Sequence, residues 1–84
     1  MKAREQIIWK NLGDEVILLD TQNGEYFVLN ETAAMMWNML MKNIPTEQII
    51  AAVTESFEID EKSAGNDFND FLRSLLDSRI IENR

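Results

Sequence analysis

The sequence predicts an α+β domain in which a three-stranded antiparallel β-meander precedes three helices, an arrangement similar to a winged helix-turn-helix. Short apolar runs separated by turn residues fill the first third of the chain, and apolar residues at helical spacing fill the remainder. A chain of 84 residues has room for one hydrophobic core. We therefore expect a single domain over residues 1–84.

The three predicted strands cover residues 6–10, 15–20 and 25–29. Residues 11–14 contain Asn, Gly and Asp, which tight turns select, and Asn23-Gly24 is a strong hairpin signal. The centre of the second strand is apolar without alternation, so we expect part of it to be buried on both faces. The strand order predicts that the third strand forms an edge of the sheet.

Three helices are predicted after the strands. Asn30, Thr46 and Asp60 are expected to cap them, because short polar side chains accept hydrogen bonds from free amides of a first helical turn. The first helix should end near Lys42, before Pro45. The predicted inward faces carry Ala33, Trp37, Leu40, Met41 and Ile44; then Ile49, Ile50, Val53 and Phe57; then Ala64, Phe68, Phe71, Leu72, Leu75 and Leu76. A short extended segment at Ile80-Ile81 closes the chain.

Composition argues against most kinds of chemistry. The chain has 15 acidic and 8 basic residues, a formal net charge of −7, and neither Cys nor His. It therefore lacks the commonest metal ligands and the usual nucleophile–base pairs, and its acidity disfavours nucleic acid. No apolar run is long enough for a membrane span. We expect a cytoplasmic protein, not an enzyme, with no cofactor and no metal, although the acidity by itself could serve only solubility.

Two side-chain clusters have a structural interpretation. Asp67 with Asp70, and Glu58 with Asp60 and Glu61, are candidate carboxylate pairs, but a domain this small has little volume to enclose a substrate. Met35, Met36, Met39 and Met41 gather on the first helix, and we interpret them as core filling rather than as a surface for varied partners.

The third strand is the candidate functional element. Tyr26, Phe27, Val28 and Leu29 are bulky and uncharged, so an edge made of them is poorly protected and suits the addition of a strand from a partner peptide. Asp67, Asp70 and Ser74 share one helical face and are candidates for an acidic wall beside it. Alternatively, the third helix or a dimer partner covers this edge.

The stretch Leu18-Leu19-Asp20, Gly24-Glu25-Tyr26, Leu29-Asn30-Glu31-Thr32-Ala33 and Trp37 resembles the pattern LLD…GxYxxLNxTAxxxW of the PqqD-like family. Members are recognition elements for ribosomally made, post-translationally modified peptides, and this form looks most like the stand-alone version of lasso-peptide pathways. The chain departs from the family at Lys42-Asn43, where many members have Asp-Gly, and at Arg79, where many have Gly.

The resemblance implies a non-catalytic scaffold that binds a precursor's leader as an extra antiparallel strand and delivers it to a leader peptidase or, less expectedly, a radical-SAM maturase. Carried onto this sequence, it implies a peptide-binding site made of Glu25, Tyr26, Phe27, Val28, Leu29, Asp67, Asp70, Phe71 and Ser74. The acids would face Lys or Arg of the leader, and the protein would be a monomer or weak homodimer. The alternative is a winged-helix-like regulatory or dimerisation module, with generic catalysis a distant third.

Overall fold

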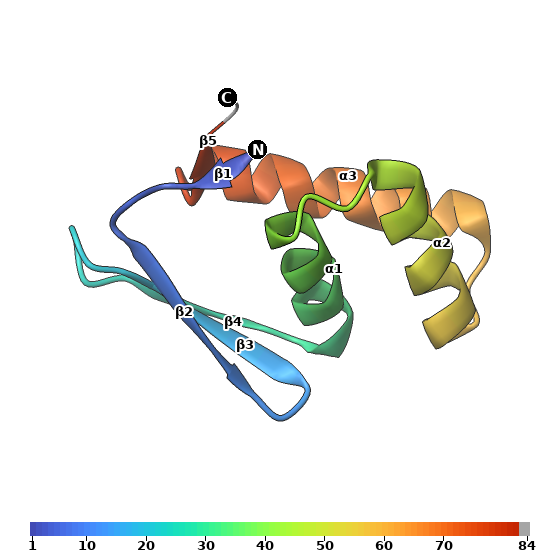
Figure 1. Ribbon diagram of the computed structural model, residues 1–84, viewed down its shortest axis with the longest axis horizontal. Helices are drawn as coiled ribbons and strands as arrows, with labels where there is room; N and C mark the ends of the chain where they lie inside the picture. Colours follow the sequence, from blue (N-terminus) through green and yellow to red (C-terminus); the bar gives the residue numbers. More distant parts are fainter. Residues whose placement is uncertain (83–84) are drawn as a thin grey trace.

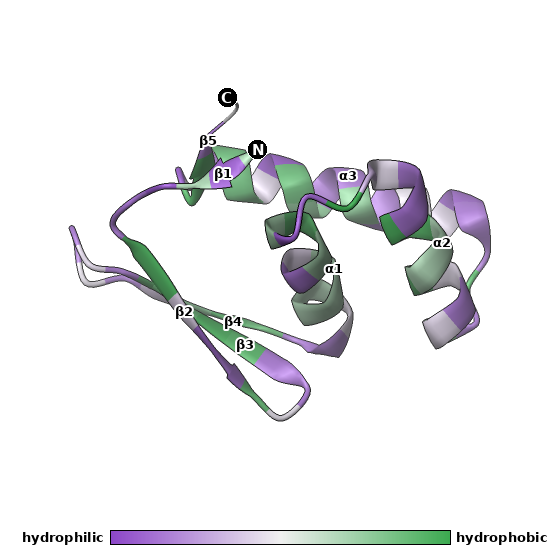
Figure 2. Cartoon of the chain, in the orientation of Figure 1, coloured by the Kyte–Doolittle hydropathy of each residue, from purple (hydrophilic) through white to green (hydrophobic). Residues whose placement is uncertain are grey.

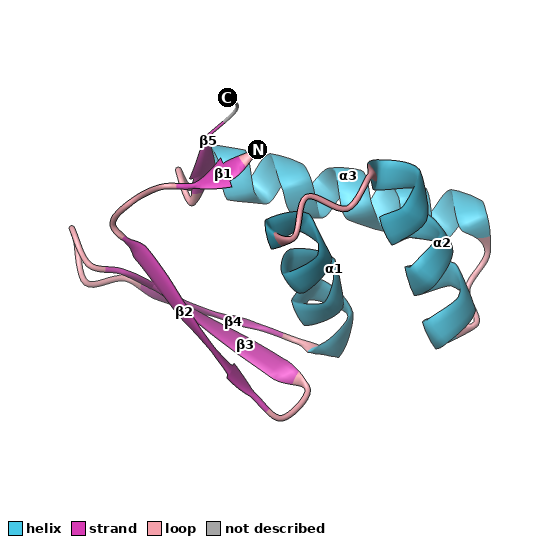
Figure 3. Cartoon of the chain, viewed as in Figure 1, coloured by secondary structure: helices cyan, strands magenta, loops and turns pink. Residues whose placement is uncertain are grey.

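The computed structural model describes residues 1–82 and has the α+β architecture that the sequence predicts (Figure 1). Three strands, β2 (Ile7–Leu12), β3 (Glu15–Asp20) and β4 (Tyr26–Leu29), form an antiparallel sheet in the order β2-β3-β4. Three helices follow, α1 (Glu31–Met41), α2 (Thr46–Phe57) and α3 (Glu61–Asp77), as Figure 3 shows. A second, two-stranded sheet pairs β1 (Lys2–Ala3) with β5 (Ile81–Glu82).

The strand boundaries differ slightly from the prediction. β2 reaches Leu12, so the turn to β3 is only Gly13 and Asp14, with Gly13 in the left-handed region at φ +60°. A two-residue hairpin turn requires positive φ, which Gly adopts without steric cost. β4 begins at Tyr26, and Glu25 lies before it rather than in it.

Only one face of β3 is fully covered. Val16 and Leu18 are completely buried, whereas Ile17 and Leu19, which point to the opposite face, are half-buried. The expectation of burial on both faces is therefore met only in part. We call the face that bears Val16 and Leu18 the inner face, because Trp37 of α1 lies in the same buried cluster. Figure 2 shows the apolar character of this part of the sheet.

Two of the three predicted helix caps are confirmed. The Oδ1 atom of Asn30 accepts a hydrogen bond from the Ala33 amide at 3.0 Å, and that of Asp60 accepts one from the Ser63 amide at 2.7 Å. Thr46 is wrong as a cap: it is the first residue of α2, the cap position is Pro45, and no side chain bonds the first turn. The Pro45 carbonyl instead accepts hydrogen bonds from the Gln48 amide at 3.0 Å and the Ile49 amide at 3.1 Å.

The core consists of two buried clusters. One joins the sheet, α1, α3 and the C-terminal strand around Trp37 and Leu18, and the other joins the three helices around Ile49 and Phe68. Half-buried Leu40, Phe71 and Leu72 pack against both. The methionines of α1 also pack against these clusters, which confirms their interpretation as core residues.

The predicted helix faces need two corrections. In α1, Ala34 and Met36 are buried, whereas Ala33 is half-buried. In α3, Leu76 is 38% exposed rather than inward. Helical spacing locates the centre of an apolar stripe more accurately than its margins, because residues at a margin are covered only where a neighbouring element reaches them.

The two departures from the family pattern occupy turns that suit glycine. Asn43 has φ +60° and Arg79 has φ +58°, both in the left-handed region. At the end of α3, the Arg79 amide donates to the Leu76 carbonyl at 3.1 Å and the Ile80 amide to the Leu75 carbonyl at 2.9 Å. This pairing is the Schellman motif, in which a left-handed residue ends the helix. The chain then continues into β5.

Candidate functional site

The open edge of the sheet lies along β4, which pairs with β3 and with no other strand among residues 1–82. The Asp20 amide donates to the Glu25 carbonyl at 2.8 Å, so this pair is hydrogen-bonded. Hydrogen-bonded and non-hydrogen-bonded pairs alternate along an antiparallel ladder. In the observed register, Phe27 and Leu29 therefore direct their backbone groups towards β3, and Tyr26 and Val28 direct theirs towards the open edge.

The side chains of β4 divide between the two faces of the sheet. Tyr26 is 68% exposed and Val28 is 53% exposed, and both lie on the outer face. Phe27 and Leu29 are half-buried and pack against the inner cluster that contains Leu18 and Trp37. The predicted edge strand is thus confirmed, and the same residues that offer free backbone groups also expose their side chains.

The turn before β4 holds the start of the strand. The Glu25 amide donates to Asn23 Oδ1 at 2.9 Å, and Asn23 Nδ2 donates to Glu25 Oε1 at 3.2 Å. Gly24, at φ +77°, donates its amide to the Asp20 carbonyl at 2.8 Å. The Glu25 side chain is therefore hydrogen-bonded to Asn23 within the turn. Its role in peptide binding stays a prediction.

A buried ion pair anchors the other side of this turn. Asp20 is 3% exposed, accepts hydrogen bonds from the Gln22 amide at 2.9 Å and from Arg4, and forms an ion pair with Arg4. Burial alone would raise the pKa of Asp20, but these hydrogen bonds and the charge of Arg4 hold that pKa below its ordinary value. The pair fixes the segment before β2 against the end of β3.

Helix α3 brings one predicted site residue to the core beside β4. Phe71 is half-buried and packs against the same cluster as Phe27 and Leu29. Asp67, Asp70 and Ser74 are exposed, and none makes an ion pair or side-chain hydrogen bond with another residue of the described chain. Their spacing keeps them close to the flank of α3 that carries Phe71.

Sequence reasoning could not divide the four strand residues by role. Tyr26, Phe27, Val28 and Leu29 are all apolar, so no polar–apolar alternation marks which of them face out. The contribution of Arg4 was also missed, since the sequence holds no signal that pairs it with Asp20. Only the folded register reveals both.

Among residues 1–82, no group of three His, Cys, Asp or Glu side chains is placed to hold a metal ion. Over the same residues, no helix is long and apolar enough to cross a membrane. The edge offers the outward backbone groups of Tyr26 and Val28, whose side chains are exposed on the outer face.

Comparisons with known proteins agree with this geometry. The family model described as coenzyme PQQ synthesis protein D (PqqD) matches residues 15–81. The solved structure of TbiB1 in complex with the TbiA(beta) leader peptide is 30% identical, with a TM-score of 0.91 over 100% of this chain and 98% of that chain. No curated protein sequence matches.

A second solved structure, lasso peptide synthetase B1 complexed with the leader peptide, is 24% identical. Its TM-score is 0.90 over 98% of this chain and 96% of that chain, which shows the same fold. The family match includes β3, β4 and all three helices, and therefore every element of the candidate site. The chain belongs to the PqqD family.

Proposed function

We propose that this chain binds the leader region of a ribosomally synthesised precursor peptide, of the lasso class, as an additional antiparallel strand on β4. The observation that carries the proposal is the open edge, where Tyr26 and Val28 direct unpaired backbone groups outwards. Strand addition to such an edge is a recurring mode of peptide recognition. The similarity to TbiB1, whose structure contains a leader peptide, supports the same ligand class here.

The register of β4 sets the pattern that a bound leader must follow. Residues opposite Tyr26 and Val28 pair through the backbone and direct their side chains to the outer face. Residues opposite Phe27 and Leu29 direct theirs to the inner face, towards the flank of α3 that bears Phe71. Each backbone hydrogen bond to the leader contributes a net free energy of only about 0.5–1.5 kcal/mol and is the same for any peptide sequence. The inward apolar side chains therefore supply most of the selectivity.

Charge adds a second element of selectivity. Asp67 and Asp70 are exposed acids near the proposed groove, and Ser74 extends the same flank of α3. In a chain with a formal net charge of −7, they favour a leader that carries Lys or Arg. Glu25, which bonds Asn23, contributes through the turn that positions the start of β4.

The proposed role is non-catalytic delivery. The bound leader is presented in trans to a leader peptidase or, less expectedly, to a radical-SAM maturase. We place this role in the cytoplasm, where ribosomes supply the precursor, and assign it to a monomer or weak homodimer. The open edge is compatible with both states, because strand addition needs only one copy of β4.

Titration of a labelled leader peptide tests the proposal. The probe is the leader of the precursor encoded beside the gene for this chain, titrated with the purified protein by fluorescence anisotropy. We expect a Kd well below 1 mM, a threshold equivalent to about 4 kcal/mol. In an NMR titration, the largest amide shifts should fall on residues 26–29. Binding weaker than 1 mM, or shifts confined to β2, would refute the proposal.

A duplex DNA probe under the same low-salt conditions separates the alternative from the proposal. A regulatory winged helix would bind it and should lose affinity steeply as salt rises. We expect no binding, because α3 presents Glu61, Asp67, Asp70 and Asp77 against only Lys62 and Arg73.

A further inference from the structure

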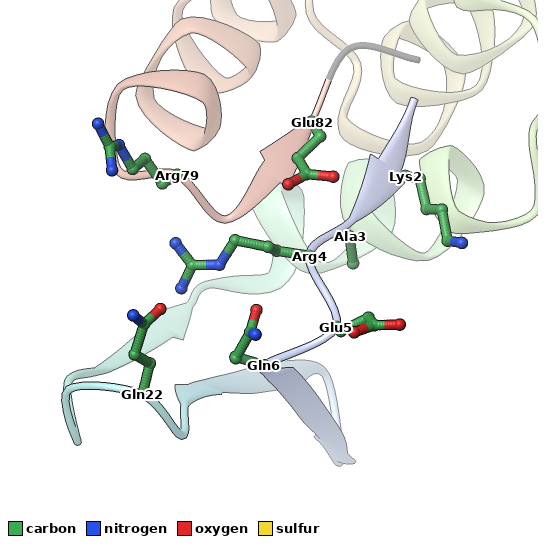
Figure 4. A pocket seen from close by; sticks show the side chains of 8 residues that line it. All are labelled: Lys2, Ala3, Arg4, Glu5, Gln6, Gln22, Arg79 and Glu82. Atoms are coloured by element: carbon green, nitrogen blue, oxygen red, sulfur yellow. The ribbon is translucent and has the colours of Figure 1, made fainter.

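A cleft of about 620 Å³ opens where the segment before β2, the turn between β3 and β4, and the end of α3 meet (Figure 4). Arg4, Gln6, Gln22 and Arg79 line it. Figure 4 shows the Arg4 guanidinium and the two glutamine amides on one side of the segment, whereas Lys2 and Glu5 point to the other. Three basic side chains, Lys2, Arg4 and Arg79, and two acidic ones, Glu5 and Glu82, line the cleft, whereas the chain as a whole has a formal net charge of −7.

Arg4 is held in place before any ligand arrives. Its ion pair with buried Asp20 fixes one end of the guanidinium, and the side chain is 16% exposed. Its Nε atom is buried and has no hydrogen-bond partner. Asp20 in turn accepts the Gln22 amide at 2.9 Å, which ties the guanidinium to the turn before β4. The guanidinium is thus held at a fixed place in the wall of the cleft, with its Nε atom enclosed and only its exposed part available to a ligand.

Arg79 occupies a backbone position that disfavours its own residue type. At φ +58°, it is the left-handed residue of the Schellman motif that ends α3. Glycine takes this conformation without the steric cost that any Cβ atom incurs. The Arg79 side chain makes no ion pair or hydrogen bond with the described residues, although it lines the cleft. The backbone conformation therefore gives no reason for an arginine at this position. What the arginine adds is a positive charge in the cleft.

The cleft lies at one end of the open edge. Gln22 belongs to the turn that leads into β4, and Arg79 follows α3 directly. A strand added antiparallel to β4 passes Leu29 first and Tyr26 last. The residues that follow the paired segment of the peptide therefore leave the edge at this cleft.

We infer that this cleft is an anion site that binds a carboxylate side chain of the peptide, just C-terminal to the segment paired with β4. The inference rests on the proposed function and adds a second charge requirement to it. Arg4 and Arg79 donate to the carboxylate, with the side-chain amide of Gln22 as a further donor. Glu82 also lines the cleft, so the ligand carboxylate is favoured on the side of Arg4 and Arg79, away from Glu82.

The site also fixes the direction of the peptide. Bases of the leader are favoured near Asp67 and Asp70, and an acid is favoured only at the cleft. A leader bound in the reverse direction would bring its acid to the acidic flank of α3, where like charges repel.

Paired variants of protein and peptide test the inference. The same labelled leader is prepared with each Asp or Glu replaced in turn by Asn or Gln. We expect one position, C-terminal to the paired segment, to weaken binding about five- to tenfold on the unmodified protein. The original leader should bind the Arg79→Gly protein about five- to tenfold more weakly than the unmodified protein. The leader with its critical acid replaced should bind the Arg79→Gly protein as tightly as the original leader does.

Lys62→Gln is the matched control, because it removes the same charge at the opposite end of α3, and it should change affinity less than about twofold. Arg79→Gly should unfold at an equal or higher denaturant concentration, since glycine suits the turn. The difference between the two variants should shrink near 1 M salt, where the screening length is about 3 Å. If Arg79→Gly binds as tightly as Lys62→Gln, or the peptide replacement still weakens binding, the anion site is refuted. If the unmodified protein does not bind the leader, the proposed function itself fails.

Discussion

The two edge strands of the sheet differ in how far the protein itself closes them. On β2, the Ile7 amide donates to the Arg4 carbonyl at 2.9 Å, so the chain satisfies part of its own edge. Lys10 places a charge in the middle of that strand, and the Asn11 side chain is bonded to Asn38 at 2.8 Å. On β4, residues 26–29 carry no charge, and no other described strand pairs with the outward backbone groups.

The difference shows which edge is available to a partner. Natural proteins blunt exposed edges with charges, proline or local coverage, because an unblunted edge pairs with other chains. β2 has a charge and local coverage, whereas β4 is short but has neither a charge, a proline nor a covering segment among the described residues. A short strand without them is a liability unless a specific partner occupies it, and this is the reason that the proposed leader site lies on β4.

Proline substitutions at residues with an outward N–H on each edge distinguish the two edges most directly. Val28→Pro removes an outward N–H of β4, and we expect leader affinity to fall at least about thirtyfold, or about 2 kcal/mol. Asn11→Pro is the control on β2. The Thr21 amide donates to the Gln6 carbonyl, so this pair of the β2–β3 ladder is hydrogen-bonded, and hydrogen-bonded and non-hydrogen-bonded pairs alternate from it along β2. Asn11 belongs to a non-hydrogen-bonded pair, and its N–H therefore also points to an open edge.

We expect Asn11→Pro to change leader affinity less than about twofold, as measured by anisotropy with thermal unfolding as a check of folding. Equal losses of affinity in the two variants would show that the edges are not distinguished, and the assignment of the leader to β4 would have to be abandoned.

Alanine substitutions on the two faces of β4 separate stability from recognition. Phe27→Ala removes an inward side chain that packs beside Leu18 and Trp37, and should lower the free energy of unfolding by about 2 kcal/mol. Tyr26→Ala, which truncates a side chain that is 68% exposed, should lower it by no more than about 0.5 kcal/mol. Urea denaturation measures both. Similar losses from the two variants would contradict the assignment of the inner and outer faces.

Charge reversal on α3 tests whether the helix forms a wall of the β4 site. Asp67→Lys together with Asp70→Lys should weaken a basic leader about fivefold at low salt, and less as salt rises. Glu47→Lys together with Glu55→Lys, on α2, makes the same change in net charge away from β4. If both double variants weaken binding equally, only the net charge of the protein matters and the acids of α3 are not part of the site.

The smallest effect that we expect is on the stability of the fold at acidic pH. Because the folded-state pKa of Asp20 lies below its ordinary value of 3.8, its carboxylate stabilises the fold at pH values above that figure. This contribution is lost as the pH falls below 3.8 and through the folded-state pKa. Urea midpoints measured from pH 6 to pH 2 should fall less steeply for Asp20→Asn than for the unmodified protein. Parallel curves would show that Asp20 does not contribute.

The sequence was sufficient wherever the determining contacts are local. The capping bonds of Asn30 and Asp60 span three residues, so their residue types and the apolar runs behind them predict the helix starts. The same rule failed at Thr46, since the preceding Pro45 already ends the loop and takes the cap position. The edge position of residues 26–29 follows from the order of short strands and tight turns.

Features that depend on distant pairs could not be predicted. The pairing of β1 with β5 brings together Lys2 and Glu82, and neither segment is long enough to be recognised as a strand by itself. Arg4 and Asp20, which shape the cleft beside β4, are 16 positions apart and meet only after the meander has formed. The family resemblance predicts a surface on which a peptide would bind, whereas the charges at the end of that surface are visible only in the folded chain.

The pairing of β1 with β5 also makes the fold suitable for circular permutation. Lys2 and Glu82 are register partners, so neighbouring backbones at the two ends lie about 5 Å apart and a short linker can join them. New ends can be opened at the exposed Gly13-Asp14 turn, which lies outside β4 and the helices. Such a protein would keep β4 and all three helices in one uninterrupted segment, with the linker joining the two segments that line the cleft.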